Sequence, residues 1–170
     1  MTRRPGIFPT FFLSGFECST FDWRDRGRRD LAAETQHRAR ADEDYRLLRE
    51  LGIAVAREGI PWPLVDRGGT YDFTCVDPLI AAMNAAQILP IWDLCHYGYP
   101  DDVDPYAPEF ADRFARYCRA AAEYVTTRVR RPEGWPQKPK KVISLIGVKH
   151  CGQPSGRRTR VVTYSAAARQ

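Results

Sequence analysis

The 170-residue sequence has few lysines, no long hydrophobic run and no regular cysteine pattern. Its five cysteines contain no CxxC pair and no metal-ligand spacing, which predicts reduced thiols in a cytoplasmic protein without a metal. No stretch approaches the roughly 20 apolar residues of a membrane span, so no membrane partner is expected. The apolar run at residues 7–13 contains Pro9 and Thr10 and lacks a small-residue cleavage site, so a secretion signal is not expected either.

Nucleotide-binding motifs are missing as well. The sequence contains neither GxGxxG nor GxxxxGK[ST], and we therefore expect no cofactor. A hydrophobic content of 44% and a charged content of 28% are typical of a globular chain that is long enough for one core.

The charges divide the chain in two. Residues 1–127 carry fifteen arginines, no lysine and twenty acidic residues, whereas residues 128–170 carry seven arginines, all four lysines and one glutamate. The net charge changes from −5 to +10 at this boundary. We therefore predict a folded domain over 1–127 and a basic tail over 128–170.

The first 127 residues alternate short apolar runs with segments of helical periodicity. The runs at 11–16, 53–56 and 88–92 predict strands, and the segments 39–51, 78–87 and 108–127 predict helices. The first helix is expected to begin with Asp42 as its cap and the second with Asp77. Residues 22–37 lack periodicity and predict a loop, with His37 on the surface. Alternating strands and helices predict an α/β fold with a parallel sheet.

Polar side chains stand where each of the three strands ends, and the last is followed by two tyrosines. In chain order these candidate binding residues are Glu17, Arg57, Glu58, Asp93, His96, Tyr97 and Tyr99. In a parallel sheet without nucleotide motifs, such strand ends are typical of a (β/α)₈ barrel, whose sites form at the carboxyl ends of the strands. The chain is long enough for the first half of such a barrel, since a complete one needs roughly 250 residues.

The strand ends resemble those of a known family. The segments 15–20 (GFECST), 56–62 (AREGIPW) and 92–100 (WDLCHYGYP) are similar to the first three strands of β-glucosidase-like glycoside hydrolases, nearest to family 1. The resemblance covers residues 10–125. It implies that Arg57 orients a nucleophilic carboxylate and that His96 binds a sugar hydroxyl. It also implies that the aromatic residues stack on a pyranose ring, while Glu17 departs from the family pattern.

Structural roles for the same residues remain open at this point. Arg57 and Glu58 are equally compatible with an ion pair that only stabilises the fold. His96 is compatible with an ordinary loop histidine, and Tyr97, Tyr99 and Trp92 with core packing.

Both catalytic carboxylates that the resemblance implies are missing. They would come from an Asn-Glu pair after the fourth strand and a glutamate after the seventh. The fourth strand is predicted at 142–148, but Lys149-His150-Cys151 follows it. We therefore expect a truncated or inactive relative of β-glucosidases that takes a small β-glycoside, with a non-catalytic carbohydrate-binding fragment as the alternative. A frame-shifted ending would explain the tail, nucleic-acid binding by the tail is not expected, and an unpaired sheet edge predicts self-association.

Overall fold

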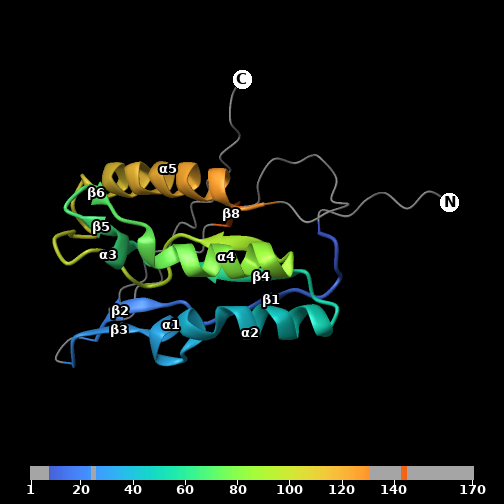
Figure 1. Cartoon of the computed structure of the whole chain (residues 1–170). Helices are drawn as coiled ribbons and strands as arrows, with labels where there is room; N and C mark the ends of the chain where they lie inside the picture. The colour runs from blue at the N-terminus through green and yellow to red at the C-terminus, as the bar shows by residue number, and fades with distance from the viewer. Residues whose placement is uncertain (1–7, 24–25, 131–142, 145–170) are drawn as a thin grey trace, which may run out of the picture.

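The computed structural model describes residues 8–23, 26–130 and 143–144. Its main sheet contains β1 (Ser14–Gly15), β4 (Val55–Gly59), β7 (Leu89–Asp93) and β8 (Ile143–Ser144), in that order and all parallel (Figure 1). The predicted α/β fold with a parallel sheet is confirmed. Within the described residues the sheet is open and does not close into a barrel.

The register of β4 against β7 decides which side chains share a face. Arg57 is paired with Ile91, and Glu58 with Trp92. Because side chains alternate along a strand, Arg57 lies on the same face as Asp93, and Glu58 lies on the opposite face with Trp92. Both strands extend one to three residues further than predicted, so these polar residues belong to the strands themselves.

Three longer helices accompany the sheet: α2 (His37–Glu50), α4 (Asp77–Ala86) and α5 (Phe110–Arg128) (Figure 1). Helix α2 packs against α4. The core between helices and sheet contains Tyr45, Met83, Trp92 and Tyr117, which are at most 3% exposed. The Glu58 face of the sheet is therefore the face that the helices cover.

Helix α2 differs from its prediction at its start and in its buried face. It begins at His37 after Gln36, which has a φ of 62° and makes no side-chain cap, so Asp42 does not cap the helix. His37, Ala41 and Tyr45 are its buried residues. Their four-residue spacing puts them on one side of the helix, and a histidine and an alanine do not signal such a face as leucines do.

Two leucines of the predicted 39–51 helix, Leu47 and Leu51, are solvent-exposed, whereas Leu48 packs against the core. Leu47 is 43% exposed and Leu51 is 74% exposed. Likewise, the predicted strand at 11–16 is reduced to Ser14–Gly15, because Phe11 and Phe12 are 92% and 70% exposed. These residues are hydrophobic, but their composition alone did not predict whether a partner surface would bury them.

Residues 22–37 are not a loop. They contribute to an antiparallel hairpin of β2 (Thr20–Asp22) and β3 (Arg28–Asp30), followed by the short helix α1 (Leu31–Glu34). Asp30 caps α1 by accepting a hydrogen bond from the backbone of Ala33. His37 is 3% exposed, so its predicted surface position is wrong. The charged side chains of β3 hid the hairpin, because Arg28 and Arg29 pair with Asp101 and Glu34 outside it instead of alternating with apolar residues.

The segment after β4 holds the helix α3 (Trp62–Val65), a hairpin of β5 (Asp66–Arg67) and β6 (Thr70–Tyr71), and the 3-10 helix η2 (Thr74–Val76). The buried carboxylate of Asp66 accepts hydrogen bonds from Trp62 Nε1 at 3.0 Å and from Arg113 Nε at 3.0 Å. It therefore fixes Trp62 against helix α5. The predicted cap Asp77 makes no capping bond and instead accepts a hydrogen bond from Tyr124.

The predicted fourth strand is described in part. Ile143 and Ser144 pair with Trp92 and Asp93 of β7. Residues 145–148 and the Lys149-His150-Cys151 segment lie outside the described residues, as does most of the basic tail. The domain boundary at residue 127, the tail's relation to nucleic acid and self-association through a sheet edge stay predictions. Among the described residues, no helix is long and apolar enough to cross a membrane.

Candidate functional site

The carboxyl ends of β1, β4 and β7 surround a shallow hollow. Its lining includes Cys18, Thr20, Asp93, His96 and Gly98, with the segment 60–63 on the other side. Two backbone hydrogen bonds hold the loops in place: Thr20 N donates to His96 O at 3.2 Å, and Ile60 N donates to Asp93 O at 2.9 Å. The three strand ends that the sequence singles out therefore meet at one place.

Arg57 and Asp93 form the central ion pair. The Nε of Arg57 donates to Oδ2 of Asp93 at 3.1 Å, and Nη2 donates to the same oxygen. Asp93 is 1% exposed, so its carboxylate depends on this guanidinium for charge compensation. The alternative that Arg57 pairs with Glu58 is wrong, because the two side chains lie on opposite faces of the sheet.

His96 turns one ring nitrogen toward this pair. Its Nδ1 lies 3.2 Å from Arg57 Nη2 and 3.4 Å from Cys18 Sγ. The nearer of these groups, the Arg57 guanidinium, can only donate, whereas the carboxylate oxygen Oε1 of Glu17 lies further away at 3.5 Å, so we assign Nδ1 as the accepting nitrogen and place the proton of the neutral ring on Nε2. Burial lowers the pKa of His96, and Arg57 lowers it further against the attraction of Asp93 and Glu17. Within the described residues, Nε2 has no hydrogen-bond partner and is available to a ligand.

Glu17 supplies an ionised acceptor at the rim. Its side chain is 47% exposed, and its Oε1 accepts a hydrogen bond from Ser19 N at 2.9 Å and lies 3.5 Å from His96 Nδ1. Burial opposes ionisation, but the hydrogen bonds from Ser19 and the charges of His96 and Arg57 outweigh it and lower the pKa of Glu17. This carboxylate is therefore an acceptor and not a proton donor near neutral pH.

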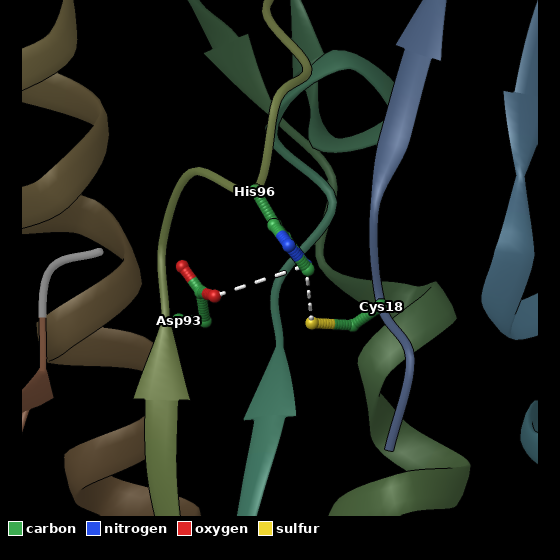
Figure 2. Close-up of side chains that lie close together, drawn as sticks. All are labelled: Cys18, Asp93 and His96. Atoms are coloured by element: carbon green, nitrogen blue, oxygen red, sulfur yellow. Dashed lines mark hydrogen bonds and ion pairs between the residues drawn. The ribbon is translucent and has the colours of Figure 1, made fainter. Parts of the chain in front are cut away.

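Cys18, Asp93 and His96 point toward one another (Figure 2), and one possible ligand atom from each lies within 4.8 Å of the others. A metal ion bound there would have to displace the guanidinium of Arg57 from Asp93 and His96 and would stand beside its positive charge. Burial, followed by the charge of Asp93, raises the pKa of the Cys18 thiol to about 12. We therefore assign these side chains to a hydrogen-bond cluster and not to a metal site.

The two tyrosines after β7 have different surroundings. Tyr97 is 42% exposed, has a φ of 64°, and its ring centroid is 4.7 Å from that of His96. Tyr99 packs edge-on against Phe110 at 6.3 Å and belongs to the margin of the core. Only Tyr97 offers an aromatic face beside the cluster; Trp92 is a core residue.

The structure does not bring Glu58 to the hollow. It is fully buried behind the sheet, where His37 Nε2 lies 2.8 Å and Tyr45 OH 2.5 Å from its Oε2. Its second oxygen accepts a hydrogen bond from the backbone of Gly59 at 3.0 Å. Its predicted role in substrate binding therefore has no geometric support.

Two residues of the site escaped the sequence analysis. Cys18 stands within the GFECST segment and Gly98 within the WDLCHYGYP segment, but neither was singled out. A Cβ at Gly98 would lie 1.4 Å from the backbone oxygen of Thr20, and one at Gly59 would lie 2.4 Å from Cys18 Cβ. The β2–β3 hairpin and the loop after β7 can touch only because residue 98 is glycine. Glycine beside an aromatic strand end is a signal for such close approach.

Comparisons with known proteins add the following. No family model and no curated protein matches the sequence. Among solved structures, the psychrophilic β-glucosidase BglU from Micrococcus antarcticus is 27% identical and covers 56% of this chain and 22% of its own, with a TM-score of 0.49. A β-glucosidase from Thermotoga maritima in complex with castanospermine is 27% identical and covers 56% of this chain and 24% of its own, with a TM-score of 0.48.

The chain resembles β-glucosidases, as its strand-end motifs predict. It spans only about a quarter of the length of these two proteins.

Proposed function

We propose that the hollow at the strand ends binds the glycone of a small β-glycoside, in a protein of glycoside hydrolase lineage. The observation that carries this proposal is the cluster of Glu17, Arg57, Asp93 and His96 at three neighbouring strand ends, of which Asp93 and His96 line the hollow and Glu17 and Arg57 contact them. Tyr97 is the proposed aromatic contact.

The cluster is suited to sugar hydroxyls because it presents donors and acceptors side by side. Glu17 accepts as a carboxylate, and His96 donates through Nε2. A hydroxyl group both donates and accepts, so it can bridge such neighbours. The exposed ring of Tyr97 adds an apolar surface beside the polar one. This combination of few convergent polar groups with an aromatic face is typical of small-ligand sites.

The described carboxylates favour binding over hydrolysis. Retaining hydrolysis needs two carboxyl groups about 5 Å apart, one of them a proton donor with a raised pKa. Glu17 has a lowered pKa, and Asp93 is committed to Arg57. The function we propose for these residues is therefore recognition with little or no turnover.

Titration calorimetry with methyl β-D-glucoside tests the proposal. We expect saturable binding that is lost in His96→Ala and weakened in Glu17→Gln, because each removes a hydrogen bond to the sugar. Glu43→Gln is the matched control, since it removes the same charge from an exposed position on α2. Absence of saturable binding by the unaltered chain would overturn the proposal, and burst release of nitrophenol from an aryl β-glucoside would overturn the lack of turnover.

A further inference from the structure

A second polar cluster lies on the helix-covered face of the sheet, and it is centred on His37. Nδ1 of His37 is 2.6 Å from Asp44 Oδ2, and Nε2 is 2.8 Å from Glu58 Oε2. Both ring nitrogens thus face carboxylate oxygens, which accept hydrogen bonds but do not donate them. Only the doubly protonated imidazolium satisfies both contacts. Tyr45 completes the cluster by donating to Glu58.

This cluster is joined to the hollow through two strands. The ring of Phe16 stacks on His37 with a centroid distance of 3.7 Å and an interplanar angle of 11°. Phe16 immediately precedes Glu17, and Glu58 immediately follows Arg57. The backbone N of Phe16 donates to Arg57 O at 3.2 Å. His37 therefore contacts the residue next to each of two side chains, Glu17 and Arg57, that contact His96 in the lining of the hollow.

We propose that protonated His37 is a positioning residue for the hollow: it fixes Phe16 and Glu58, and through them Glu17 and Arg57. Ligand binding at the hollow then depends on the proton that His37 carries. The effect of this proton on ligand binding rests on the proposed function, whereas the positioning of the side chains by His37 does not.

The charges around His37 determine the direction of the pH effect. Helix α2 contributes Asp44 and the phenol of Tyr45, β4 contributes Glu58, and the residue after β1 is the uncharged Phe16. Burial by itself lowers the pKa of His37, but hydrogen bonds and charges from Glu58 and Asp44 outweigh burial and raise the pKa above its ordinary value of 6.5. When the proton leaves, one ring lone pair faces a carboxylate, and that contact becomes repulsive.

Histidine-specific ¹⁵N NMR tests the positioning without any ligand. The chain has three histidines, so the ring signals of His37 and His96 can be assigned by substitution. We expect the His96 signals to show a second step at the pKa of His37. Asp44→Asn should shift that step to lower pH by about one unit or more, because it removes one of two adjacent negative charges. Glu43→Gln on the same helix should leave the step in place.

Glucoside titrations over the same pH range test the dependence of binding. We expect affinity to fall several-fold as His37 loses its proton, with the midpoint shifted to lower pH in Asp44→Asn. A His96 signal with a single step that Asp44→Asn does not move would overturn the inference, even if sugar binds. If no sugar binds at any pH but the second step is present, the proposed function fails and the positioning by His37 stands. His37→Gln should abolish the step, and Asp44→Asn decides the question if His37→Gln does not fold.

Discussion

Arg57 and Glu58 are neighbours in one strand, yet they belong to two polar clusters with opposite properties. The side chain of Arg57 is 28% exposed and pairs with Asp93, a carboxylate of the next strand that lines the hollow. Glu58 faces the helices, where it is sealed from solvent and bound by His37 and Tyr45. The first cluster keeps groups available to a ligand, whereas in the second both ring nitrogens of His37 and both carboxylate oxygens of Glu58 have partners within the protein.

The two histidines, His37 and His96, show what separates the clusters. His96 faces the cation Arg57, and its pKa is lowered, with burial as the first cause. His37 faces two carboxylates, and its pKa is raised although burial acts against it. Burial, assisted by Arg57, therefore outweighs the nearby carboxylates at His96 and keeps that ring neutral, whereas at His37 the two carboxylates outweigh burial and favour the cation.

The largest effect on stability is expected from the sealed cluster. Glu58→Ala leaves the His37 imidazolium without one of its two carboxylates and Tyr45 without its acceptor. Breaking a buried ion pair in this way typically lowers the free energy of unfolding by about 3–5 kcal/mol. Urea unfolding followed by tryptophan fluorescence measures the loss. Glu43→Gln, at an exposed position on α2, is the control. Equal losses of stability in the two variants would contradict a special role for Glu58.

A smaller loss of stability is expected from a substitution in the cluster of Arg57, Asp93 and His96 at the hollow. Asp93→Asn removes the charge that compensates Arg57 but keeps an oxygen for the backbone of Cys95. Because the guanidinium is partly solvated, we expect a loss of about 1–3 kcal/mol in the free energy of unfolding. Glucoside binding should weaken in the same variant. A loss as large as that of Glu58→Ala would show that the two clusters are equally sealed.

The pH dependence of stability separates the two histidines. A folded-state pKa of His37 above 6.5 means that its stabilisation is fully present below pH 6.5 and is lost as pH rises through the folded pKa. For His96, whose folded-state pKa is lowered, the sign is the reverse: stability falls as pH decreases below 6.5. The free energy of unfolding can be measured with urea from pH 5 to pH 9. Its decrease at alkaline pH should vanish in His37→Gln, and the His96 contribution to its decrease at acidic pH should vanish in His96→Gln. Unchanged pH profiles in both variants would contradict these assignments.

The smallest effect on stability is expected at Tyr97, which is exposed beside the hollow. Tyr97→Ala should change the free energy of unfolding by no more than about 0.5 kcal/mol, as is usual for surface positions. Tyr97→Gly should be neutral or stabilising, because glycine adopts the positive φ of 64° without strain. Both variants should weaken glucoside binding alike in calorimetry. Retention of full affinity would remove Tyr97 from the proposed site.

Much of the architecture was predictable because the apolar runs are short and regularly separated. The order of strands and helices and the meeting of Arg57, Asp93 and His96 at one edge are confirmed. The hairpin after β1 was not predicted, because β3 consists of charged residues without apolar alternation, and Arg29 pairs with Glu34 outside the hairpin. The burial of His37 was not predicted either, since its partner Glu58 lies 21 residues away in the sequence.

Hydrophobic periodicity and strand length are local properties of a chain. The parallel sheet, and the presence of polar side chains at the carboxyl ends of its strands, could therefore be predicted from the amino-acid sequence alone. The tertiary structure decided how those side chains divide between two faces. The register of β4 against β7 turns Arg57 toward the hollow and Glu58 toward α2. A one-residue shift would exchange them, and register depends on packing between segments that are far apart in the chain.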